Sequence, residues 1–334
     1  MIRRSESGRL LAAALAAAAL AACADDGTRT LSEPFDPAAV QADQRALEQV
    51  LSSDALAAFE ALGLRVERER PLRVVGAAGV PVISDESRGV TFVYDPVQDR
   101  YVPDAGRAGA PETGVRFILY DVDAASGRPD VTREVGHADL IDEGDDTPDG
   151  PALRFVVTHT GEVVLDYAVA ASGGEDAGSV AIDGTLGAGV DRLDFDIDLE
   201  GRREAGRESA DLAFALEMPE RDFAAVARVA NVHDTGEDTG EVVLTVRYDG
   251  VTFGVELNGS RSLLEGTFSV DGEPFAVVSG DPADPAITRP DGSPLEPEQV
   301  RALVGVLQLQ EHAFRLLGDL MRPAGDIIHL GIVL

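Results

Sequence analysis

The stretch DRLDFDIDLE, residues 191–200, decides the fold because apolar and acidic residues alternate along it. Successive side chains of an extended strand point to opposite faces. One face of this segment would carry Leu193, Phe195, Ile197 and Leu199. The other face would carry Asp194, Asp196, Asp198 and Glu200. This pattern indicates a half-buried strand of an antiparallel sheet.

A second stretch, EVVLTVRYDGVTFGVELNGSRS, residues 241–262, has the pattern of two strands joined by a tight turn. Apolar residues alternate on both sides of Asp249-Gly250, and this dipeptide favours a two-residue hairpin turn. Asn258-Gly259 is the same kind of turn signal, so we expect the chain to reverse again there.

Further alternating segments extend the pattern from about residue 72 to 279, and turn signals recur about every ten residues. They contain Phe92/Tyr94, Val115/Phe117/Leu119, Val163/Leu165/Tyr167, Leu212/Phe214/Leu216 and Phe268/Val270. We therefore predict a mainly β fold. Its core would be one large, curled antiparallel sheet, a meander that resembles half of a barrel.

Helices are expected at both ends of this sheet, against its concave side. Asp36-Pro37 can cap and begin a helix, and two short amphipathic helices would follow up to Gly63, with Leu56, Phe59 and Leu62 on the apolar face of the second. A C-terminal amphipathic helix is expected from about Pro297. Its apolar stripe would contain Val300, Leu303, Leu307, Phe314, Leu317 and Met321.

The first 22 residues have the features of a secretory signal peptide. Three arginines, Arg3, Arg4 and Arg9, precede an uninterrupted apolar run over residues 10–20. That run is too short to cross a bilayer as a helix, which takes about 20 residues. A charged start, a short apolar segment and small residues before a break are typical of an export signal that is cleaved.

The end of this segment, Leu20-Ala21-Ala22-Cys23, resembles the lipobox of bacterial lipoproteins, in which Leu and two small residues precede a Cys. The resemblance implies cleavage before Cys23 and a lipid on its thiol. Each buried methylene contributes about 0.8 kcal/mol, so two or three acyl chains anchor a domain durably. In Gram-negative lipoproteins an Asp directly after the Cys favours the inner membrane, but Ala24 stands here, which favours the outer membrane. The alternative is a plain secretory signal in which Cys23 has no role.

The expected organisation follows from these features. Residues 1–22 would be the lipoprotein signal peptide, residues 23–35 a lipidated flexible tether, and residues 36–334 a single mostly β globular domain. If the domain is subdivided, the segment ASGGEDAGS, residues 171–179, is the expected boundary. Cys23 is the chain's one cysteine, so no intramolecular disulfide can form.

The chain is strongly acidic, with 28 basic and 60 acidic side chains and a net charge of −32. Cleavage before Cys23 would remove three arginines and one glutamate, which leaves 25 basic and 59 acidic side chains and a side-chain charge of −34. Such a surface repels nucleic acid and anionic lipid head groups, so no nucleic-acid partner is expected. It suits solubility, cationic partners or divalent ions.

Carboxylates gather in the segment DEGDDTPDG, residues 142–150, which is a candidate for a calcium loop. Ca²⁺ takes hard oxygen ligands from flexible loops, but the regular D-x-D-x-[DN]-G spacing is missing, so a solvated loop is the alternative. The candidate ligands are Asp142, Glu143, Asp145, Asp146 and Asp149. DVDAASG, residues 121–127, begins like such a loop but has Ala125 at the third ligand position. HDTGEDTGE, residues 233–241, fits a hairpin connection better than a ligand set. No other cofactor is expected.

Catalytic motifs are missing from the sequence. The five histidines, His137, His159, His233, His312 and His329, show no metal-binding spacing. There is no G-x-S-x-G elbow and no phosphate-binding loop with lysine. A triad assembled from distant residues would leave no such motif, so an enzyme stays a lesser alternative.

The sequence is compatible with three functions. The first is a lipid-anchored envelope lipoprotein, held at the membrane through Cys23, that binds or scaffolds another envelope protein without catalysis. The second is a periplasmic carrier of lipid or another hydrophobic ligand, which a curled sheet with helices would suit. The third is an envelope hydrolase.

Overall fold

The structure is a computed structural model. It describes residues 57–59, 61–62, 83–144, 152–174, 176–204, 206–234, 237–248, 250–297, 299–300 and 303. Within these residues the chain forms fifteen strands: β1 (Val90–Asp95), β2 (Arg100–Pro103), β3 (Gly114–Val122), β4 (Pro129–Asp142), β5 (Ala152–His159), β6 (Glu162–Gly173), β7 (Ala177–Leu186), β8 (Leu193–Glu204), β9 (Arg207–Met218), β10 (Phe223–Asp234), β11 (Glu237–Tyr248), β12 (Val251–Ser260), β13 (Leu264–Val270), β14 (Glu273–Asp281) and β15 (Asp284–Thr288).

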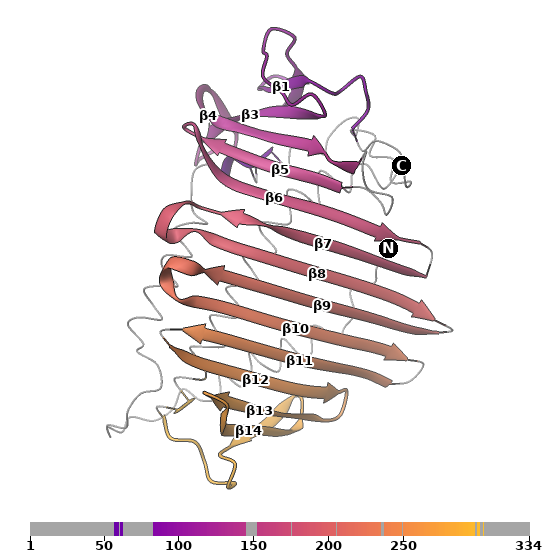
Figure 1. Ribbon diagram of the computed structural model, residues 1–334, viewed down its shortest axis with the longest axis vertical. Coiled ribbons are helices and arrows are strands. Elements are labelled where there is room, and N and C mark those ends of the chain that lie inside the picture. The colour runs from indigo at the N-terminus through magenta and orange to yellow at the C-terminus, as the bar shows by residue number, and fades with distance from the viewer. Residues whose placement is uncertain are drawn as a thin grey trace. The chain divides into compact units, whose positions relative to one another are not determined.

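These strands form one sheet in the order β15-β14-β13-β12-β11-β10-β9-β8-β7-β6-β5-β4-β3-β1-β2. From β3 to β15 every strand lies beside its neighbours in sequence, as Figure 1 shows. The predicted mainly β fold, with a large antiparallel meander, is therefore confirmed.

One pair of strands departs from the antiparallel meander. β1 pairs in parallel with β3, with Val90 opposite Val115 and Phe92 opposite Phe117. The reason is the position of β2, which forms an antiparallel hairpin with β1 and takes the outer side of it. β2 runs opposite to β1, so the connection after β2 crosses to the other side of β1. β3 begins there and runs in the same direction as β1.

The two predicted turns around β12 have different outcomes. Tyr248 pairs with Val251, and Gly250 has a φ of +75°, so the turn at Asp249-Gly250 is confirmed. The turn at Asn258-Gly259 is wrong, because both residues lie inside β12, where Asn258 pairs with Glu241 and Glu265. The chain reverses after β12 instead, where Ser260 Oγ accepts hydrogen bonds from the backbone N–H groups of residues 262 and 263.

Only short parts of the predicted helices are among the described residues. Residues 57–59 and 61–62 are helical, and Phe59 and Leu62 are buried as expected. Near the other end, the Val300 N–H donates to the Glu296 carbonyl at 3.1 Å, and Leu303 is helical and buried. The remainder of both helical regions, the signal peptide and the tether lie outside the described residues.

The described residues fall into two compact units. The N-terminal unit contains those between 57 and 174 and residues 179–196, and the C-terminal unit contains residues 176–178 and those between 197 and 303. In the N-terminal unit, Phe155 stacks on Tyr167 with ring centroids 4.9 Å apart, and Phe59 packs edge-on against Phe155. The core of the C-terminal unit includes the mutually packed rings of Phe253, Phe268 and Phe275.

Candidate functional site

The candidate calcium segment begins at the last residue of β4, Asp142. Along β4, Leu140 and Asp142 point to the same face, and both residues are buried. The Asp142 side chain is 0 % exposed. A carboxylate is costly to bury unless hydrogen-bond donors or a positive charge compensate it, so its surroundings decide what it does.

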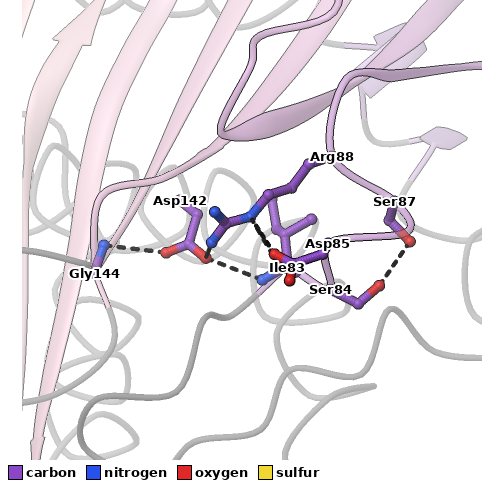
Figure 2. Close-up of polar contacts among 7 residues, drawn as sticks. All are labelled: Ile83, Ser84, Asp85, Ser87, Arg88, Asp142 and Gly144. Carbon is purple, nitrogen blue, oxygen red and sulfur yellow. Dashed lines mark hydrogen bonds and ion pairs between the residues drawn. The ribbon is translucent and has the colours of Figure 1, made fainter.

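Three donors surround the Asp142 carboxylate, as Figure 2 shows. Oδ2 accepts a hydrogen bond from the Ile83 N–H at 3.1 Å and another from Arg88 Nη2 at 3.4 Å. Oδ1 accepts one from the Gly144 N–H at 3.1 Å. Arg88 Nε in turn donates to the Ile83 carbonyl at 3.3 Å, so one arginine joins both partners.

A compact turn presents Arg88 to this carboxylate. The N–H groups of Ser87 and Arg88 donate to the Ser84 carbonyl, and the Ser84 and Ser87 hydroxyls are hydrogen-bonded at 3.0 Å. Asp85 is also near Arg88, at 3.8 Å from Nε, but its side chain is 91 % exposed. The buried ion pair thus ties the turn at residues 83–88 to the end of β4.

This geometry gives Asp142 a structural role. Its buried carboxylate accepts three hydrogen bonds, and these hold the end of β4 to the turn at residues 83–88 and to Gly144. The other described candidate, Glu143, lies 3.9 Å from Arg154 Nη1. Asp145, Asp146 and Asp149 lie outside the described residues, so calcium binding by this loop stays a prediction. Among the residues that the structure describes, no group of three or more metal-ligating side chains is close enough to hold a metal ion.

The segment at residues 121–127 forms the connection between β3 and β4. The Asp123 carboxylate accepts hydrogen bonds from the Ser126 hydroxyl and the Ser126 N–H, both at 2.8 Å. These bonds, the hydroxyl first, lower the pKa of Asp123 below its ordinary value. Asp123 therefore shapes the turn between β3 and β4.

A second buried arrangement of charges lies on the opposite face of β3 and β4. Arg116 and Asp139 are directly opposite in register and form a two-pronged ion pair, with Nε–Oδ1 and Nη2–Oδ2 distances of 2.7 Å. His137 Nε2 lies 3.8 Å from Asp139 Oδ2. Burial, followed by the charge of Arg116, lowers the pKa of His137 despite the opposing effect of Asp139. The imidazole is thus favoured in its neutral form.

The segment at residues 233–241 forms the β10–β11 hairpin, which confirms the predicted connection. His233 pairs in register with Asp238, and His233 Nδ1 is hydrogen-bonded to Asp238 Oδ1. Arg261 donates from Nε and Nη2 to Asp238 Oδ2, at 2.9 and 2.7 Å. The sequence reasoning missed this cluster. Its signal was a basic and an acidic residue placed five positions apart across a hairpin turn.

The remaining candidate residues are Cys23 and three histidines. Cys23, His312 and His329 lie outside the described residues, and His159 lies at the end of β5 opposite Glu162. Lipidation of Cys23 stays a prediction. In the described part of the chain, no helix is both long and apolar enough to cross a membrane.

Comparisons with known proteins give no relative on which to base a function. No protein-family model, curated protein or solved structure matches this chain.

Proposed function

We propose that this protein is an exported envelope lipoprotein, anchored by lipid at Cys23, whose β domain acts as a non-catalytic binding or scaffolding protein. The lipobox residues Leu20-Ala21-Ala22-Cys23 support the anchor. The position of Ala24 after the cysteine supports attachment to the outer membrane.

The observation that carries the binding role is the polar face of β8–β13 in the C-terminal unit. Along each strand its residues alternate with the buried ones. Cross-strand pairs, such as Val243 opposite Glu256, show which residues of neighbouring strands share this face. We call it the outer face. Its charged residues are Asp198, Glu200, Arg202, Glu204, Arg207, Asp211, Glu217, Arg228, Asp234, Glu241, Arg247, Glu256 and Glu265.

Acidic residues exceed basic ones on the outer face. Arg202 and Arg228 each lie near an acid of the same face, at 3.3 Å from Glu200 and 3.4 Å from Asp211. Arg247 is turned to Asp222, in the turn before β10. The remaining carboxylates give the face a negative potential, which favours encounter with a positively charged partner surface. We therefore infer that the partner is an envelope protein with a basic patch.

Metabolic labelling with palmitate tests the anchor. The wild-type protein should incorporate label and fractionate with the outer membrane, whereas Cys23→Ala should incorporate none. Ala24→Asp should keep the label and move the protein to the inner membrane. Label that persists in Cys23→Ala would refute the anchor.

Cross-linking in intact cells tests the binding role. A triple variant, E241Q/E256Q/E265Q, removes three exposed negative charges from neighbouring strands of the outer face. The control, E86Q/E112Q/E162Q, removes three exposed negative charges from the N-terminal unit. A cross-linked product lost only in the outer-face variant would support the proposal, and no product in the wild type would count against it.

One observation favours a carrier of hydrophobic ligands as a second candidate. The Tyr167 hydroxyl is buried and has no hydrogen-bond partner among the described residues, and its ring packs between Phe155 and Phe195. Burial raises the pKa of Tyr167, so the phenol stays a neutral donor. A polar group of a bound amphiphile would satisfy it. Native mass spectrometry of protein purified from membranes should then show bound lipid mass, and a clean apo mass would contradict this candidate.

A further inference from the structure

The Asn258-Gly259 dipeptide lies near the end of β12, although its sequence is typical of a turn. β12 lies between β11 and β13, and Asn258 pairs in register with Glu241 on one side and with Glu265 on the other. All three side chains are exposed on the outer face. An accessible Asn-Gly sequence is therefore held inside a strand, with a carboxylate on each side of the asparagine.

Asn-Gly is a sequence prone to deamidation, because glycine has no side chain to hinder attack by its backbone nitrogen. The Gly259 nitrogen attacks the side-chain amide carbon of Asn258, and the C–N bond of that amide breaks. The amide nitrogen leaves as ammonia with the proton of the Gly259 N–H, and a cyclic succinimide remains. Water then opens the ring at either carbonyl to give aspartate or isoaspartate. The reaction consumes only water.

The strand opposes this ring closure. Attack requires a backbone torsion at Asn258 that differs from that of an extended strand. Pairing of Gly259 with Gly240 and Leu264 holds the chain extended. Opening is nevertheless favoured here, because the exposed reversal at residues 261–263 follows directly, and strand ends open more readily than strand centres. The Gly240–Gly259 pair also lacks the side-chain contact that stabilises other cross-strand pairs.

We propose that Asn258 is a deamidation site that is gated by opening of the β12–β13 hairpin end. While the strands are paired, the dipeptide is extended and the ring cannot close. When the end opens, the Gly259 nitrogen reaches the amide carbon of Asn258.

Both products would favour the open form of this hairpin end. Aspartate at position 258 would place a third carboxylate between Glu241 and Glu265, and like charges directly opposite each other destabilise an antiparallel pair. Isoaspartate would add a methylene to the main chain, so the residues after it would lose their register with β11 and β13. The reaction would thus convert a transient opening into a permanent one.

Peptide mapping by mass spectrometry, after incubation of the full chain at mildly alkaline pH, tests the site. The chain contains two asparagines, and Asn231, which precedes Val232 in β10, is the internal control. Asn258 should convert about tenfold faster than Asn231, because the branched side chain of Val232 hinders attack and Asn258 lies nearer to a strand end that opens. Equal conversion at the two sites, or none at Asn258, would overturn the proposal.

A variant of the turn after β12 tests the gate. The Ser260 hydroxyl accepts hydrogen bonds from the backbone N–H groups of residues 262 and 263, at 3.3 and 3.2 Å. Ser260→Ala removes both bonds and should accelerate conversion of Asn258 about threefold to fivefold. Ser126→Ala, which removes a hydroxyl from the β3–β4 turn, is the matched control and should leave the rate unchanged. An unchanged rate in Ser260→Ala would refute gating by this hairpin end.

Hydrogen exchange tests the effect of the product and needs no deamidation. Asn258→Asp introduces the third carboxylate directly, and amide exchange in peptides covering residues 255–265 should be about twofold faster than in the wild type. Asn258→Gln is the control, because it keeps a neutral amide and should exchange more slowly than Asn258→Asp. Equal exchange in the two variants would show that the added charge does not open the hairpin end.

Discussion

Arg88 Nη2 and Asp142 Oδ2 are 3.4 Å apart at the end of β4, and the Asp142 side chain is fully buried while that of Arg88 is 19 % exposed. Two residues far apart in the sequence therefore form one structural joint. Because a buried charge without its partner is costly, this joint should dominate the stability of the surrounding turn.

The first prediction concerns the charge of Asp142. Asp142→Asn keeps the shape of the side chain but leaves Arg88 without its buried counter-charge. We expect the free energy of unfolding to fall by roughly 2–4 kcal/mol, measured by urea denaturation. Asp85→Asn is the matched control, since Asp85 is 91 % exposed and should change stability by less than about 0.5 kcal/mol. Equal effects of the two variants would show that Arg88 does not depend on Asp142.

The second prediction concerns two tyrosine hydroxyls in the N-terminal unit. Tyr101 Oη donates to the Ile118 carbonyl at 3.1 Å, whereas the buried Tyr167 Oη has no partner among the described residues. Tyr101→Phe should therefore cost about 1 kcal/mol, and Tyr167→Phe should be neutral or stabilising by up to about 1 kcal/mol. Urea denaturation of both variants gives the comparison. A loss in Tyr167→Phe as large as in Tyr101→Phe would mean that its hydroxyl is satisfied.

The third prediction concerns close backbone approach at Gly136. A Cβ at this position would lie 1.9 Å from the Thr158 carbonyl oxygen, which is backbone and cannot move aside alone. Gly136→Ala should lower the free energy of unfolding by about 1–3 kcal/mol. Gly174→Ala is the control, because nothing lies within 4 Å of its added Cβ. A harmless Gly136→Ala would show that β4 and β5 can separate there without cost.

The periodicity of the sequence was sufficient for the sheet. In β8, Leu193, Phe195 and Ile197 are buried and Asp196 and Asp198 are exposed, as alternation required. The parallel β1–β3 pair was not predictable, because periodicity reports which face is buried and not which strand lies alongside. Asn258-Gly259 failed as a turn signal because the pairing of Gly259 with Gly240 and Leu264 extends β12 through it.

The candidate site was less predictable, because its chemistry depends on contacts between distant residues. The sequence placed Asp142 in an acidic loop, where only its neighbours in the chain suggested a role. Its hydrogen-bond partners Ile83 and Arg88 lie more than fifty residues earlier in the chain. Neither these contacts nor the burial of Asp142 could be inferred from the loop sequence. The His233–Asp238 pair, in contrast, was accessible from the sequence, since a hairpin with that turn brings the two residues opposite each other.

The fourth prediction concerns the response of His137 to acid. Burial lowers the pKa of His137 below its ordinary value of 6.5, so the folded state accepts a proton less readily than the unfolded chain. Its contribution to stability is present above pH 6.5 and is lost as the pH falls through the folded pKa. The wild type should therefore lose more stability between pH 7.5 and 5.5 than His137→Gln does.

His159→Gln is the control, because His159 lies outside the cluster of Arg116, His137 and Asp139, and this variant should follow the wild type. Urea denaturation of the three proteins at both pH values gives the comparison. If His137→Gln loses as much stability on acidification as the wild type, the lowered pKa of His137 is wrong.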